Sequence, residues 1–204
     1  MTRRQVVIFI SGSGSNMEAL IKATQMPDYP ATIAAVISDQ STAAGLDKAR
    51  AYHVPTHIFE RKAFASRQAH EDAILQCLAC YHPDILCLAG YMRLVSGRFI
   101  APYQGRILNI HPSLLPLFPG LDTHQRALDA GMKVAGCTVH LVTEGMDEGP
   151  VLAQASVPVQ PDDTAQTLAQ RILTTEHHLY PVALRAFIEK KLPQQQQTGN
   201  LPVF

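Results

Sequence analysis

The feature that most constrains the fold of this chain is a repeated alternation of strand candidates with segments of helical composition. The strand candidates occupy residues 6–10, 32–37, 57–59, 85–89 and 106–111. The helical segments occupy residues 17–23, 43–52, 66–80 and 123–130. Continuous apolar runs are typical of strands covered on both faces, and repeated strand–helix units join into a parallel sheet through right-handed crossovers. The sequence therefore predicts an α/β, Rossmann-like fold with a mostly parallel central sheet and helices on both faces.

The alternation ends in the C-terminal third of the chain. Residues 136–142 and 151–159 are successive strand candidates with no helix between them, which favours an antiparallel C-terminal portion of the sheet. Residues 162–164, Asp-Asp-Thr, can cap a long helix over residues 165–190, and Pro181 should kink or divide that helix. The prediction is a single domain over residues 1–192, followed by a tail at residues 193–204 that we expect to be disordered.

Charge and hydropathy exclude several classes of partner. The 204 residues include 17 basic and 17 acidic side chains and no Lys/Arg cluster, so nothing indicates a nucleic-acid or membrane-surface partner. No apolar stretch approaches the roughly 18 residues that a membrane span needs. The first apolar run, residues 6–10, is too short for a signal sequence. We therefore expect a cytoplasmic protein that binds small molecules.

A glycine-rich turn, residues 12–16, lies between the first strand and the first helix. The backbone N–H groups and the positive end of the helix dipole at such a turn can bind a phosphate. Met17 stands where the dinucleotide fingerprint requires its third glycine, and the Gly-Lys-Ser/Thr of a Walker A loop is absent. A single small phosphate is the favoured ligand, and a plain turn of small residues is the alternative.

Asn109 and His111 lie two residues apart at the end of a strand that Pro112 terminates. On a strand this spacing points both side chains to the same face. An amide beside an imidazole at the carboxyl end of a strand suits catalysis. The alternative is that both are ordinary polar groups, one satisfying a turn and one lying in a polar rim.

Asp147 lies in a loop between Gly145 and Gly149, after the strand that carries His140. If the sheet forms as predicted, this loop reaches the same rim as His111. A carboxylate there favours the cationic imidazole that a general acid needs. The alternative is that Asp147 caps its own turn. His140 is a candidate either for the core or for support of the site.

Cys77 and Cys80 have the spacing of half a zinc site, but no second pair completes four ligands. We therefore expect no metal, and we interpret these two residues, with Cys87 and Cys137, as small buried hydrophobic side chains.

Five motifs in the same order and spacing resemble the folate-dependent formyltransferase family, and within it the phosphoribosylglycinamide formyltransferases (glycinamide ribonucleotide transformylases). They are residues 10–16, 89–94, 109–116, 136–140 and 146–150. The resemblance extends from Val6 to about Tyr180. It implies transfer of a formyl group from the co-substrate 10-formyltetrahydrofolate to the amine of glycinamide ribonucleotide in purine biosynthesis, without a metal. The protein would then be a monomer or a homodimer.

The resemblance also implies a role for individual residues. The catalytic residues would be Asn109, His111 and Asp147; the ribonucleotide-binding residues would be Gly14, Ser15, Asn16 and Glu176; the folate-binding residues would be Arg67, Met92, Arg93, Leu94, Val95 and Asn109. Asp122 stands where a histidine is common in the family, and Leu117 where some members carry lysine. Both departures fall in a loop that we expect to be mobile.

Three other functions are compatible with parts of these patterns. Hydrolysis of formyltetrahydrofolate uses the same trio, but hydrolases of that type carry an N-terminal regulatory domain for which we expect no room here. Formylation of another amine, such as that of methionyl-tRNA, calls for a basic surface that the neutral charge does not favour. A non-catalytic nucleotide-binding module would use only residues 12–16 and would leave Asn109, His111 and Asp147 unexplained.

Overall fold

The computed structural model describes residues 2–190, so the tail predicted at residues 193–204 lies outside the described residues. The described residues divide into two compact units, the first ending at Leu108 and the second beginning at Asn109. The boundary falls inside strand β5 (Ile107–His111). The prediction of a single domain over residues 1–192 stays a prediction.

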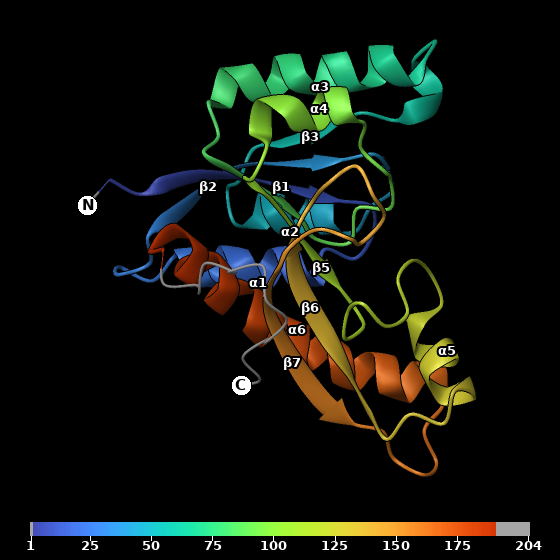
Figure 1. The fold of residues 1–204 in the computed structure, drawn as a ribbon. Helices are drawn as coiled ribbons and strands as arrows, with labels where there is room; N and C mark the ends of the chain where they lie inside the picture. The colour runs from blue at the N-terminus through green and yellow to red at the C-terminus, as the bar shows by residue number, and fades with distance from the viewer. Residues whose placement is uncertain (1, 191–204) are drawn as a thin grey trace. The chain divides into compact units, whose positions relative to one another are not determined.

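The first unit is a parallel α/β arrangement. Its elements are β1 (Arg4–Ile10), α1 (Ser15–Thr24), β2 (Ala31–Ser38), α2 (Gly45–Ala51), β3 (Thr56–Ile58), η1 (Arg61–Ala63), α3 (Arg67–Tyr81), β4 (Ile85–Leu88), α4 (Gly97–Ile100) and η2 (Ala101–Tyr103). Strand β1 pairs in parallel with β2 and β4, and β2 pairs in parallel with β3. Figure 1 shows α3 and α4 on one side of β1 and β2, with α1 and α2 on the other. Residues 6–10 of β1 are completely buried, as expected for a strand covered on both faces.

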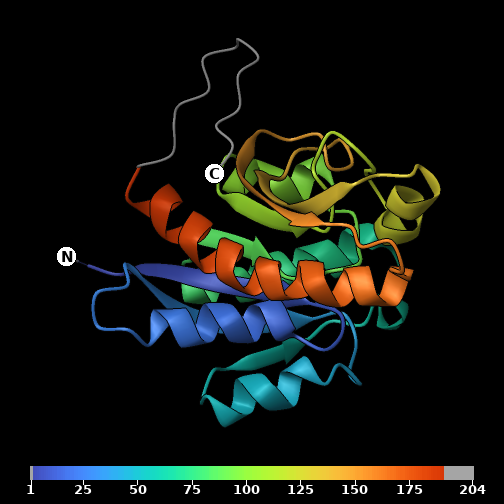
Figure 2. The same cartoon turned by 90° about the horizontal axis from the view of Figure 1, so that it is seen from below.

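The second unit contains α5 (Thr123–Asp129), β6 (Val134–Leu141), β7 (Val151–Pro158) and α6 (Ala165–Ile188). Strands β6 and β7 pair antiparallel, with a register shift between Val139 and His140. Helix α6 packs against both strands, and Figure 2 shows it as the long orange-red helix. Its apolar side chains Leu168 and Ile172 form a core with Cys137 of β6.

The predicted fold class is confirmed. The hydrogen-bonded strand order is β3-β2-β1-β4-β5-β6-β7. The pairs β1–β2, β1–β4 and β2–β3 are parallel, and the pair β6–β7 is antiparallel. None of the helices within residues 2–190 is both long enough and apolar enough to span a membrane.

Pro181 is predicted to kink or divide the last helix. It does not divide it, because α6 continues through it to Ile188, and the kink stays a prediction. Buried Tyr180, Ala183 and Leu184 lie on either side of the proline, and their packing offsets the backbone hydrogen bond that proline cannot make. The predicted start is confirmed. Thr164 is the N-cap and forms a reciprocal capping box with Thr167.

Candidate active site

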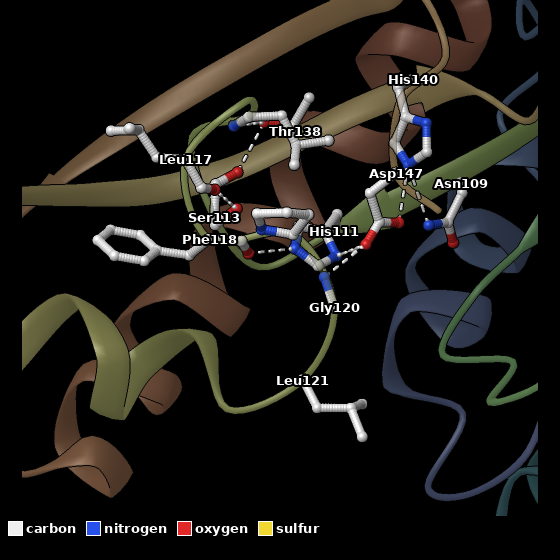
Figure 3. Close-up of polar contacts among 12 residues, drawn as sticks. Asn109, His111, Ser113, Leu117, Phe118, Gly120, Leu121, Thr138, His140 and Asp147 are labelled. Atoms are coloured by element: carbon white, nitrogen blue, oxygen red, sulfur yellow. Dashed lines mark hydrogen bonds and ion pairs between the residues drawn. The ribbon is translucent and has the colours of Figure 1, made fainter. Parts of the chain in front are cut away.

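Four polar side chains of the second unit form one cluster: Asn109, His111, His140 and Asp147 (Figure 3). Asn109 and His111 alternate with the buried Leu108 and Ile110 in β5, so both point to the same side of the strand. Asp147 lies in the loop between β6 and β7 with a left-handed φ of 56°. The structure therefore brings the three predicted catalytic residues together, and their roles stay predictions.

The Asp147 carboxylate joins the two histidines. Its Oδ2 atom lies 3.3 Å from Nδ1 of His111 and accepts a hydrogen bond of 2.9 Å from the backbone N–H of Gly120. Its Oδ1 atom lies 3.6 Å from Nε2 of His140. The alternative that Asp147 only caps its own turn does not account for these contacts, which all reach other segments of the chain.

His140 orients the Asn109 amide. Its Nδ1 atom lies 2.9 Å from the carbonyl oxygen of Leu141, which can only accept, so Nδ1 carries the hydrogen. In the neutral ring, Nε2 then has a lone pair and accepts a hydrogen bond of 3.1 Å from Nδ2 of Asn109. The amide nitrogen carries a second hydrogen that it can donate to a ligand. His140 therefore supports the site rather than the core.

His111 faces an acceptor at each ring nitrogen. Nε2 donates to the carbonyl oxygen of Phe118 at 3.0 Å, while Nδ1 faces Asp147. Only the imidazolium can donate to both. Burial nevertheless lowers the pKa of His111 below its ordinary value and outweighs the hydrogen bond to Phe118 and the charge of Asp147. The sequence predicts that Asp147 favours the cation; it acts in that direction, but desolvation of a side chain that is only 7% exposed is the larger effect.

Asp147 has the charge state that this contact requires. Burial raises the pKa of its carboxyl group, but the neighbouring His140 ring, the hydrogen bond from the Gly120 N–H and the nearby His111 together lower it by more, so the pKa lies below the ordinary value. Asp147 is therefore ionised at neutral pH, and its negative charge faces the His111 ring.

Main-chain groups of residues 117–121 complete the cluster, and the sequence patterns did not identify them. The Phe118 carbonyl accepts from His111, and the Gly120 N–H donates to Asp147. Arg126 of α5 holds the same segment by donating to the carbonyl oxygens of Pro119 and Leu121. Backbone groups carry no residue-specific signature, so only the tertiary fold could reveal these partners. The predicted mobility of this loop stays a prediction.

In the first unit, the glycine-rich turn opens helix α1. Gly14 is the N-cap and provides no side chain to cap the first amides of the helix. It has a φ of 66°, and a Cβ atom at this position would lie 2.7 Å from Cα of Gly45. The turn is thus packed closely against the start of α2, and a small anion is the ligand that helix amides at such an N-terminus favour. Ser15 and Asn16 are the first two residues of α1.

Replacement of Gly14 by alanine is expected to lower the free energy of unfolding by about 1–3 kcal/mol, because alanine is strained at positive φ and its methyl group meets Gly45. Urea denaturation would measure this loss. Gly12→Ala is the matched control, since no heavy atom lies within 4 Å of an added Cβ there. Equal stability of the two variants would contradict the close packing at Gly14.

The segment predicted to bind folate follows β4 in the first unit. The Arg67 guanidinium donates from Nη2 to the carbonyl oxygen of Leu94 at 2.8 Å, so two of the predicted folate residues are in direct contact. Met92 and Leu94 are 66% and 61% exposed, so their side chains are accessible to a ligand. Arg93 pairs with Asp39.

The remaining predictions concern Glu176, a metal and the cysteines. Glu176 is buried on α6, and its proposed contact with the ribonucleotide stays a prediction. Within residues 2–190 no group of three or more His, Cys, Asp or Glu side chains could hold a metal ion. Cys87 and Cys137 are buried as predicted and Cys77 is partly buried, but the prediction is wrong for Cys80, which is exposed.

Comparison with known proteins gives consistent results over nearly the whole chain. A model of the formyl transferase family matches residues 4–184. The phosphoribosylglycinamide formyltransferase of Escherichia coli is 41% identical over 196 residues, which cover 96% of this chain and 92% of that protein. A solved phosphoribosylglycinamide formyltransferase from Brucella melitensis is 70% identical with a TM-score of 0.89, and the match covers 91% of this chain and 96% of that one.

Some relatives are much longer. The trifunctional purine biosynthetic protein adenosine-3 of Bos taurus is 45% identical over 183 residues, which are 90% of this chain but only 18% of that protein. The chain therefore spans about a fifth of the length of these trifunctional relatives.

Proposed function

Because the chain belongs to the formyl transferase family, we propose that it transfers the formyl group of 10-formyltetrahydrofolate to the amine of N1-(5-phosphoribosyl)glycinamide. The products are formylglycinamide ribonucleotide and tetrahydrofolate, a step of de novo purine biosynthesis. The observation that carries the proposal is the cluster of Asn109, His111 and Asp147, because it presents hydrogen-bond donors beside an ionised carboxylate.

The reaction needs donors that stabilise an oxyanion. The amine nitrogen of the ribonucleotide attacks the formyl carbon, a C–N bond forms, and the formyl oxygen becomes negatively charged in a tetrahedral intermediate. The second amide hydrogen of Asn109 and an N–H of His111 would donate to this oxygen. A preorganised donor of this kind typically contributes about 100–1,000-fold to turnover.

The reaction also moves one proton. When the C–N bond to the folate breaks, its nitrogen takes up a proton, and the attacking amine has lost one. His111 would pass this proton directly or through water, with Asp147 stabilising the ring while it is protonated. To reach the substrate, Nε2 of His111 has to exchange its hydrogen bond with the Phe118 carbonyl for one with the ligand. Displacement of residues 117–121 would allow this exchange.

The binding residues follow from the same proposal. The phosphate of the ribonucleotide would bind at the start of α1 through Gly14, Ser15 and Asn16, and Glu176 would contact the same substrate. The folate would bind along Met92, Arg93, Leu94 and Val95, with Arg67 and Asn109 as further folate-binding residues. We further propose that the protein acts in the cytoplasm on small molecules alone, without nucleic acid or membrane, as a monomer or a homodimer.

Release of tetrahydrofolate is expected to depend on the acceptor amine. With saturating glycinamide ribonucleotide, release should be at least about 100-fold faster than without it, because the bound amine replaces water as an oriented nucleophile. Absorbance spectroscopy of the folate measures the rate. A rate that is equal with and without the ribonucleotide would identify a formyltetrahydrofolate hydrolase instead. Comparison with other amines at the same concentration tests the acceptor.

A further inference from the structure

A buried carboxylate in the first unit, Asp39, lies directly after β2 and uses both of its oxygens. Oδ1 accepts a hydrogen bond of 2.5 Å from the Ser11 hydroxyl, and Oδ2 lies 2.6 Å from Nε of Arg93. Asp39 is only 3% exposed, while Arg93 is about a third exposed. A charge buried to this degree is tolerated because both of its oxygens are satisfied.

Ser11 extends these contacts into a connected network. It is the first residue after β1 and stands immediately before the glycine-rich turn. Its hydroxyl oxygen accepts a hydrogen bond of 2.9 Å from the N–H of Met92, and its own N–H donates to the carbonyl oxygen of Gly90 at 3.1 Å. Because β1 and β4 are adjacent parallel strands with Phe9 opposite Leu88, the segments that follow them leave the sheet side by side.

We infer that Asp39 is a positioning residue for both substrates, since it fixes the glycine-rich turn and the segment Met92–Arg93 relative to each other. This inference rests on the proposed function, in which the turn binds the ribonucleotide phosphate and the segment binds the folate. Asp39 is not one of the predicted ligand-binding residues. It acts through Ser11 on one side and through Arg93 on the other.

A second buried carboxylate, Glu71 of α3, provides the contrast. It is 6% exposed and accepts hydrogen bonds from Nε of Arg67 at 3.1 Å and from the N–H of Ser96 at 3.0 Å, and the Ser96 hydroxyl donates to its other oxygen. Arg67 in turn holds the carbonyl of Leu94. Arg67 and Leu94 are predicted folate residues and Ser96 directly follows Val95, so Glu71 would support the folate alone, whereas Asp39 would support both substrates.

Calorimetric titration of separate binary complexes tests the inference. Asp39→Ala is expected to raise the Kd of glycinamide ribonucleotide and the Kd of a stable formyl-folate analogue by about 10-fold each, because the loss leaves Ser11 and Arg93 without their partner. Glu71→Ala is the matched control, a buried carboxylate removed at the other end of the folate segment. It should raise the Kd of the folate analogue alone and leave the Kd of the ribonucleotide within about 2-fold of the wild type.

The conservative variant Asp39→Asn distinguishes the positioning role of Asp39 from a general loss of structure around it. Asp39→Asn keeps an oxygen for Arg93 and gains an amide that can donate to the Ser11 hydroxyl, so both Kd values should stay within about 3-fold of the wild type. If Asp39→Ala does not fold, as judged by its thermal transition, Ser11→Ala replaces it and should likewise weaken both ligands. Weakening of one ligand only, by either variant, would overturn the inference. If the wild-type protein bound neither ligand, the proposed function itself would be wrong.

Discussion

Turnover of the His111→Ala variant is expected to fall at least about 100-fold, while the protein remains folded. The substitution removes the N–H that would stabilise the oxyanion and the ring that would carry the proton, and either loss alone has an effect of this size. In this variant the Asp147 carboxylate keeps its hydrogen bond from the Gly120 N–H and its contact with His140. Its charge is therefore not left without a partner, and the fold should be retained. The measurement is turnover at saturating concentrations of both substrates, together with the thermal transition.

The control for this variant is another histidine of the same unit. His178 is exposed on α6, and its ring contacts only the carbonyl oxygen of Thr174 in the preceding turn among the hydrogen bonds within residues 2–190. His178→Ala should keep turnover within about 2-fold of the wild type, since surface substitutions are usually nearly neutral. Near-normal turnover of His111→Ala would remove His111 from the mechanism.

The Asp147→Asn variant is expected to lose about 10–100-fold in turnover at pH 7.5 and to change its pH dependence. The charge of Asp147 raises the pKa of His111 against the dominant effect of burial, so its removal lowers that pKa further. Activity that needs protonated His111 is present below this pKa and is lost as the pH rises through it. The decline of kcat/KM at high pH should therefore occur at a lower pH in Asp147→Asn than in the wild type.

Asp147→Asn removes the negative charge but hardly changes the shape of the side chain, because asparagine is nearly isosteric with aspartate and keeps an oxygen for the Gly120 N–H. Glu148→Gln removes an exposed negative charge from the adjacent position of the same loop and serves as control. Its pH profile should match that of the wild type, since exposed charges are screened by water and salt. A pH profile of Asp147→Asn that coincides with the wild-type profile would show that the carboxylate does not act on His111.

Several elements of the site follow from local patterns. The two-residue spacing of Asn109 and His111 places both on one side of β5 because side chains alternate along a strand. The glycine-rich turn begins α1 with an uncapped N-terminus, and the structure adds that Gly14 is also required by the close approach of Gly45. In such cases the relevant physics acts within a few residues, and the sequence displays it directly.

The main differences arise where a local rule meets tertiary packing. Pro181 breaks an isolated helix, yet α6 continues through it, and Tyr180, Ala183 and Leu184 around it are buried. The charge of Asp147 favours the His111 cation, as a carboxylate beside an exposed imidazole would. Burial of the His111 ring nevertheless has the larger effect on the pKa of His111. Both outcomes depend on how much water the fold excludes, which no short motif encodes.

By itself, the sequence determined the α/β class, the order of the strands and helices and the residue types available at the carboxyl ends of β1 and β5, because periodicity and strand geometry are local properties. Only the tertiary structure decided which groups meet. Asp39 reaches Ser11 and Arg93 across 28 and 54 positions of the chain, and His111 and Asp147 find the Phe118 carbonyl and the Gly120 N–H. Such contacts form between distant segments or with backbone groups that every residue carries, so they depend on the folded chain as a whole.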